Sequence, residues 1–105
     1  DLAFVECAQA LARQVAALPK ADPAARATHA FRAVLARPPT AAEVERLVRL
    51  YQQELAQYQA QPAEARKMAT SELGQPKGPA NLPELAAWTV VANVLLNLDE
   101  TITKG

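Results

Sequence analysis

Apolar residues recur every three or four positions along nearly the whole chain, and this spacing constrains the fold more than any other feature. It marks one face of an α-helix, because a helix turns once every 3.6 residues. No segment shows the alternation of apolar and polar residues, bounded by turn residues, that is typical of a strand. The sequence therefore predicts an all-α fold.

Prolines and capping residues divide this pattern into expected helices. The first has Asp1 or an upstream residue as its expected cap and stops at Pro19, with Gln9 and Arg13 largely off its apolar face. The second opens with Asp22 as N-cap and a proline at the first helical position. It ends at 37–39 (RPP), because a residue before proline is pushed away from helical angles.

The third helix has the clearest start, since Thr40 and Glu43 match a capping box, and it extends to about Gln59. The short corner before it predicts a helical hairpin with the second helix. The fourth helix begins at Pro62, and Gly74 suits a C-terminal cap.

The fifth helix starts at 82–84 (LPE) and is apolar on most sides, which is typical of a central helix in a bundle. We expect Asp99 and Glu100 to interrupt it, with Ile102 as a last apolar anchor. The prediction is a compact four- to five-helix bundle with a central apolar C-terminal helix. The expected core is Phe4, Leu11, Val15, Phe31, Val34, Leu35, Leu47, Val48, Tyr51, Leu55, Trp88, Val91, Leu95 and Leu98.

A length of 105 residues fits one domain, 1–105, which we interpret as a fragment of a larger multidomain protein. Residues 74–83 are rich in proline and glycine and predict a surface loop, where disorder is most expected. The formal net charge is zero, so the chain lacks the basic field that nucleic-acid binding needs. The longest apolar run, 88–98, is too short to span a membrane.

Three stretches together resemble a known family: 1–8 (DLAFVECA), 30–43 (AFRAVLARPPTAAE) and 85–100 (LAAWTVVANVLLNLDE). Their order and spacing are similar to the C-terminal end of the planctomycete PSD-type family, domain of unknown function fifteen-fifty-three. The 88–100 pattern is the more specific part. Thr101 departs from the family, where an aromatic residue often follows the acidic one.

The resemblance implies a large exported bacterial protein, periplasmic or on the cell surface, often with a c-type cytochrome-like region and a sister domain upstream. It brings no catalytic residues, because none are established for the family. Any haem would be bound elsewhere, since this segment has no attachment motif. We therefore expect no cofactor or metal here, and the upstream domains, or other proteins, as partners.

His29 and Arg37 are the first weak candidates for a functional site. His29 has no other histidine to share a metal with, so we expect a boundary residue of the bundle. Arg37 could bind an anion, but it could equally cap the preceding helix or pair with Glu43 or Glu45.

Two further candidates are an acidic pair and a lone thiol. Asp99 and Glu100 make at most half a cation site, and we favour one of them capping a short last turn. Cys7, the single cysteine, excludes an internal disulfide and is expected to be buried as a small hydrophobe.

Aromatic and basic side chains suggest two possible surfaces. Tyr51, Tyr58 and Trp88 could stack a carbohydrate, but they fall on apolar faces, so a core role is favoured. Four arginines of the hairpin could form a basic strip, but interleaved glutamates favour a solvated face with ion pairs. These arginines are Arg26, Arg32, Arg46 and Arg49.

Two functions remain open from the sequence. The first is a non-catalytic structural or interaction module, favoured by an apolar fifth helix that keeps one face free. The second is an accessory part of an enzyme site, for polysaccharide breakdown or redox chemistry, completed by upstream domains. The second predicts a pocket lined by at least two of His29, Arg37, Asp99 and Glu100.

Overall fold

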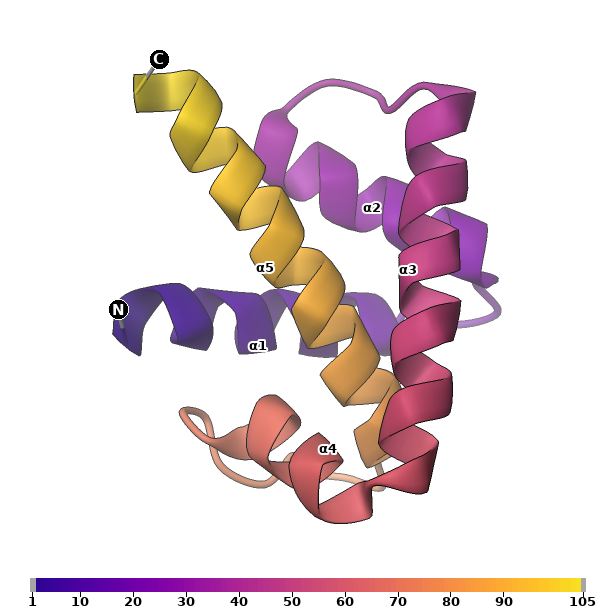
Figure 1. Cartoon of the computed structure of the whole chain (residues 1–105), viewed down its shortest axis with the longest axis vertical. Coiled ribbons are helices and arrows are strands. Elements are labelled where there is room, and N and C mark those ends of the chain that lie inside the picture. The colour runs from indigo at the N-terminus through magenta and orange to yellow at the C-terminus, as the bar shows by residue number, and fades with distance from the viewer. Residues whose placement is uncertain (1, 105) are drawn as a thin grey trace.

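Five α-helices make up the fold in the computed structural model, which describes residues 2–104 and the side chains of residues 3–99 (Figure 1). The helices pack into a body of about 35 × 30 × 23 Å, and the described residues contain no strand. The all-α prediction is confirmed. The helices are α1 (Leu2–Ala16), α2 (Pro23–Leu35), α3 (Ala41–Ala60), α4 (Pro62–Thr70) and α5 (Leu82–Lys104).

Helix α5 occupies the centre of the bundle, as the sequence predicts. It contacts each of the other four helices and crosses in front of α1, with α3 beside it and α4 near its N-terminal end (Figure 1). Helices α1 and α3 do not contact each other, and neither do α2 and α4. The C-terminal helix is therefore the shared packing surface of the whole fold.

Local capping explains where three of the helices begin. The Asp22 side chain accepts a hydrogen bond from the backbone N–H of Ala25 at 2.8 Å, and Thr40 and Glu43 form the expected reciprocal capping box. At the start of α5, the Asn81 side chain accepts from the N–H of Glu84 at 3.1 Å. The expected cap at Asp1 lies outside the described residues.

Two helix ends differ from the prediction. Helix α5 continues through Asp99 and Glu100 to Lys104, so the expected interruption is wrong. The helix contains no glycine or proline after Pro83, and polar residues do not end a helix whose packing continues. Helix α2 ends at Leu35, because Ala36 adopts a left-handed conformation with φ of 56° that turns the chain toward the corner.

The core is organised around an aromatic stack between α3 and α5. The rings of Tyr51 and Trp88 lie 4.1 Å apart with an interplanar angle of 17°. Trp88 is 1% exposed and Tyr51 is 6% exposed. The indole N–H of Trp88 has no acceptor of good geometry among the described residues, so apolar contact holds the ring in place.

Most of the expected core is confirmed, but Leu98 is 46% exposed and its assignment to the core is wrong. It lies in the last third of α5, beyond the part of the helix that its neighbours enclose. The partly buried members are Phe4, Val34, Leu35, Val48 and Leu55. The expected residues that are buried are Leu11, Val15, Phe31, Leu47, Tyr51, Trp88, Val91 and Leu95.

Small residues fill many of the contacts between the helices. Alanine has no side chain beyond Cβ, so helices that meet through it approach closely. A second cluster forms where Ala65 and Ala69 of α4 meet Leu85 and Ala86 of α5. Other fully or almost fully buried alanines are Ala8, Ala12, Ala27, Ala30, Ala87 and Ala92.

Two polar side chains of α1, Gln9 and Arg13, contact the end of α4. Gln9 is fully buried, and its amide donates to the Met68 carbonyl at 2.9 Å and to the Ser71 hydroxyl at 3.0 Å. Its oxygen accepts from the backbone N–H groups of Glu72 at 3.1 Å and Leu73 at 3.0 Å. All four hydrogen-bonding capacities of this amide are used.

Arginines complete the capping of two helix ends. Arg13 donates to the carbonyl of Ala69 at 3.3 Å and to that of Gly74. Arg26 of α2 reaches back to the end of α1, where it donates to the carbonyls of Val15 and Leu18, each at 2.9 Å. Cations stabilise helix C-termini, because the unpaired carbonyl groups there carry partial negative charge. Both arginine side chains lie at such an end.

We predict that Gln9→Ala lowers the free energy of unfolding by about 1–3 kcal/mol, because it leaves buried backbone groups without partners. Urea denaturation measures this change. Amide hydrogen exchange at Glu72 and Leu73, which donate to Gln9, should quicken selectively. The control is Gln14→Ala, an exposed position of the same helix. Equal effects of the two substitutions would contradict the capping role.

We predict that Trp88→Ala lowers the free energy of unfolding by about 3–5 kcal/mol, which approaches the whole stability of many domains of this size. The loss combines burial of the indole with its stack on Tyr51. Thermal melting followed by circular dichroism tests it, with Trp88→Phe as the variant that keeps a ring. A nearly unchanged melting temperature for the alanine variant would contradict the assignment of α5 as the central helix.

Candidate functional site

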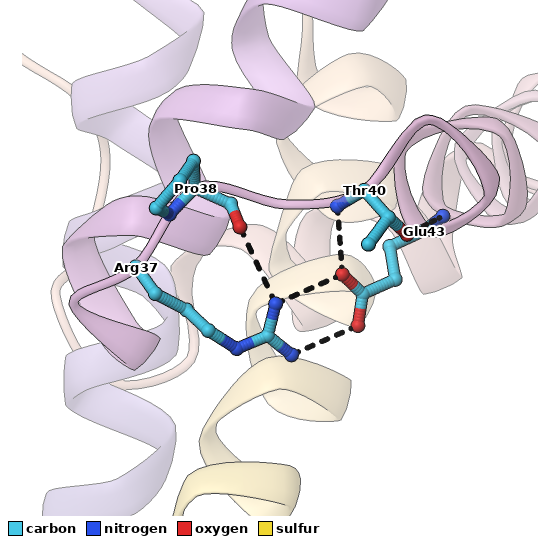
Figure 2. Close-up of polar contacts among 4 residues, drawn as sticks. All are labelled: Arg37, Pro38, Thr40 and Glu43. Carbon is cyan, nitrogen blue, oxygen red and sulfur yellow. Dashed lines mark hydrogen bonds and ion pairs between the residues drawn. The ribbon is translucent and has the colours of Figure 1, made fainter.

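Arg37 is held at the corner between α2 and α3 by contacts within the chain (Figure 2). Its two terminal nitrogens donate to the two carboxylate oxygens of Glu43, at 3.1 and 3.0 Å, and one of them also donates to the Pro38 carbonyl at 3.3 Å. The guanidinium lies 4.8 Å from the centroid of the Phe31 ring. Of the alternatives open from the sequence, the structure shows the pairing with Glu43.

Glu43 has a double role in this corner. One of its oxygens accepts from Arg37 and also from the backbone N–H of Thr40 at 2.8 Å, which closes the capping box (Figure 2). The Arg37 hydrogen bond, followed by that of Thr40, lowers the pKa of the Glu43 carboxyl from 4.5 to about 2. The side chains remain 51% and 27% exposed, so water and salt screen the pair.

The depressed pKa of Glu43 gives the corner a predictable pH dependence. Its contribution to stability is fully present above pH 4.5 and is lost as pH falls toward about 2, because protonation removes the acceptor of the ion pair. We predict a carboxyl titration midpoint near pH 2, measured by carbon NMR. In Arg37→Gln the midpoint should move up toward 4.5. A midpoint unaffected by that substitution would contradict the assigned cause.

The remaining weak candidates whose side chains the structure describes do not converge on a hollow of the surface. His29 is half-buried on α2, Asp99 is half-buried on α5, and the side chain of Glu100 lies outside the described residues. Neither of the two hollows described below is lined by His29, Asp99 or Arg37. Among the residues that the structure describes, no group of three or more histidine, cysteine, aspartate or glutamate side chains is placed to hold a metal ion.

Cys7 is exposed, so the expectation that it is buried is wrong. The buried face of α1 passes through Ala8 and Leu11, whereas Cys7 falls on the opposite stripe. Its neighbours there are also exposed: Ala3, Glu6, Ala10 and Gln14.

The aromatic residues do not form a carbohydrate-stacking surface. Tyr51 and Trp88 stack on each other in the core, so neither presents a free ring face. Tyr58 is half-buried and packs against the α4–α5 cluster. The core role favoured from the sequence is confirmed for the buried pair.

The four arginines of the hairpin do not form one strip. Arg26 caps α1, which the expectation of a solvated face missed, because its partners lie on another helix. Arg49 pairs with Glu45 at 2.7 Å, the helix-spaced ion pair that was expected. Arg32 and Arg46 are exposed.

A hollow of about 470 Å³ lies between the end of α1, the loop before α5 and the first turn of α5. Its charged side chains are Arg13, Lys77 and Glu84. Arg13 already donates to two backbone carbonyls, and Glu84 opposes the charge of Lys77. The mixture of signs gives this hollow no preference for an anion or a cation.

A smaller hollow, of about 190 Å³, lies where α2, α3 and the second half of α5 meet, and we refer to it as the α2–α3–α5 hollow. Among the described side chains, Glu43 and Arg46 are the charged residues that line it. Val94 and Leu98 line it and are 37% and 46% exposed. The other lining residues are Phe31, Leu47, Leu50 and Leu95.

Sequence reasoning missed the α2–α3–α5 hollow because three separated segments form it. The one available signal was the unusually wide apolar surface of α5, which includes Val94. None of the described helices is both long enough and apolar enough to cross a membrane. Comparison of the chain with protein-family models, curated proteins and solved structures finds no match in any of the three.

Proposed function

We propose that this chain is a non-catalytic structural or interaction module of a large exported bacterial protein. The observation that supports the proposal is the position of Val94 and Leu98. Both are large, exposed and apolar, and both line the same hollow. Single exposed hydrophobes are ordinary on protein surfaces, but apolar side chains gathered in a concave site are typical of binding surfaces.

The proposed partners are upstream domains of the same protein, or other proteins. Covering apolar surface contributes about 25 cal/mol per Å², so closing the α2–α3–α5 hollow favours association. The upstream domains and the export of the protein are proposed because the family resemblance implies them. The neutral net charge supports protein partners over nucleic acid.

We predict that Leu98→Ser weakens binding to the upstream segment of the protein while changing the free energy of unfolding by no more than about 0.5 kcal/mol. The side chain is 46% exposed, so the isolated fold depends little on it. Isothermal titration calorimetry against the upstream segment, produced as a separate polypeptide, measures the binding. Urea denaturation measures the stability.

Leu95→Ala, one turn earlier and fully buried, gives the contrasting effect on stability. This substitution should lower the free energy of unfolding by about 2–5 kcal/mol. The proposal fails if the unmodified chain does not bind the upstream segment, or if Leu98→Ser binds that segment as tightly as the unmodified chain.

A further inference from the structure

We infer that the α2–α3–α5 hollow receives an aromatic side chain from a helix of a partner protein, and that Arg46 pairs with a carboxylate beside that side chain. The inference rests on the proposed function, because it specifies the chemistry of the partner at the same site. It follows from the size of the hollow, the rigidity of its floor, the balance of its charges and the aromatic residues of the chain itself.

The size and lining of the hollow fit one ring. Its volume is about 190 Å³, and an apolar cavity of about 150 Å³ is enough to hold benzene. The floor is preformed, because Phe31, Leu47 and Leu95 belong to the core and are at most 7% exposed. A ring entering this site is met by fixed apolar walls, which keeps the ordering cost of binding low.

Among the side chains that the structure describes, those around the hollow leave one cation, Arg46, without a carboxylate partner. Glu43 is already bound by Arg37 and by the N–H of Thr40. Glu45, the neighbour of Arg46 in sequence, pairs with Arg49 at 2.7 Å. Arg46 itself pairs with no carboxylate among the described side chains, and it is exposed. The complementary group is therefore a carboxylate supplied by the partner.

The walls of the hollow are spaced for a helix. Arg46 and Leu50 lie four residues apart on α3, and Val94 and Leu98 lie four residues apart on α5. Two neighbouring helices with such i, i+4 ridges form a groove that accepts a third helix. An aromatic and an acidic residue four positions apart on that helix would face the hollow and Arg46 together.

A second copy of this chain does not fit as the occupant. The aromatic side chains of the chain are all buried or half-buried, so none is free to enter the hollow of another copy. These residues are Phe4, Phe31, Tyr51, Tyr58 and Trp88. The ring must come from a different polypeptide or a different domain.

The first test uses three small probes that share a phenyl ring and a short chain: 3-phenylpropionate, 3-phenylpropanamide and 3-phenylpropylamine. Methyl NMR of the whole chain should show saturable shifts at Leu50, Val94 and Leu98, with Kd of about 1 mM for the propionate. The propionate should bind about two- to fivefold more tightly than the amide, and the amine more weakly than both.

Two variants distinguish the contribution of the Arg46 charge from that of the apolar hollow. Arg46→Gln should reduce the affinity for the propionate to that of the amide and leave the amide unaffected. Arg49→Gln, an exposed arginine one turn along α3, is the control and should change neither affinity. Circular dichroism verifies that both variants remain folded.

A second test uses a helical peptide of about 15 residues that carries phenylalanine and glutamate four positions apart. Fluorescence anisotropy should show binding that falls about two- to fivefold when glutamate is replaced by lysine, or when Arg46 is replaced by glutamine. Shifts of residues outside the hollow, or equal affinities for all three probes, would overturn the inference.

The outcomes also distinguish this inference from the proposed function. Binding of the upstream segment that depends on Leu98, with no preference for a ring or a carboxylate, would keep the interaction module and overturn the partner chemistry. Binding of the probes at the hollow, with no binding of the upstream segment, would contradict the proposed function instead.

Discussion

The burial of α5 among the other helices is the constraint on which the rest of the structure depends. Its middle carries Trp88, which stacks on Tyr51, and alanines that allow α1 and α4 to approach closely. Among the described residues, α1 does not contact α3 and α2 does not contact α4, so α5 lies between the two helices of each of these opposite pairs. The same placement leaves the second half of α5 less covered, and this uncovered part forms one wall of the α2–α3–α5 hollow.

Long-range capping adds a second level of organisation. The end of α1 is satisfied by Arg26 of α2, and the end of α4 is satisfied by Gln9 and Arg13 of α1. Local backbone hydrogen bonds also close these ends, from the Leu18 N–H to Val15 and from the Gly74 N–H to Thr70, but the side-chain partners come from a helix elsewhere in the chain. Unfolding of α1 therefore removes the side-chain caps of α4 as well, which couples the helices beyond their apolar contacts.

The fold was predictable to the extent that it depends on neighbours in sequence. Apolar spacing predicted four or five helices, of which the structure has five, and the caps at Asp22 and Thr40 predicted two of their starts. The exposure of Leu98 and Cys7 and the burial of Gln9 were not predictable, because each depends on how distant helices lie. Likewise the Arg37–Glu43 pair was one of several local alternatives, whereas the hollow requires three helices to be placed first.

The loop between α4 and α5 is fixed at both ends, and this has a consequence for the architecture of related proteins. At its start, Gly74 adopts a φ of 74° and its carbonyl is held by Arg13; at its end, Asn81 begins α5. Loop closure becomes only about 0.6 kcal/mol more costly for each doubling of length. Residues 75–80 are therefore the segment where the chain can accept an insertion, even a folded unit, while α4 and α5 keep their places.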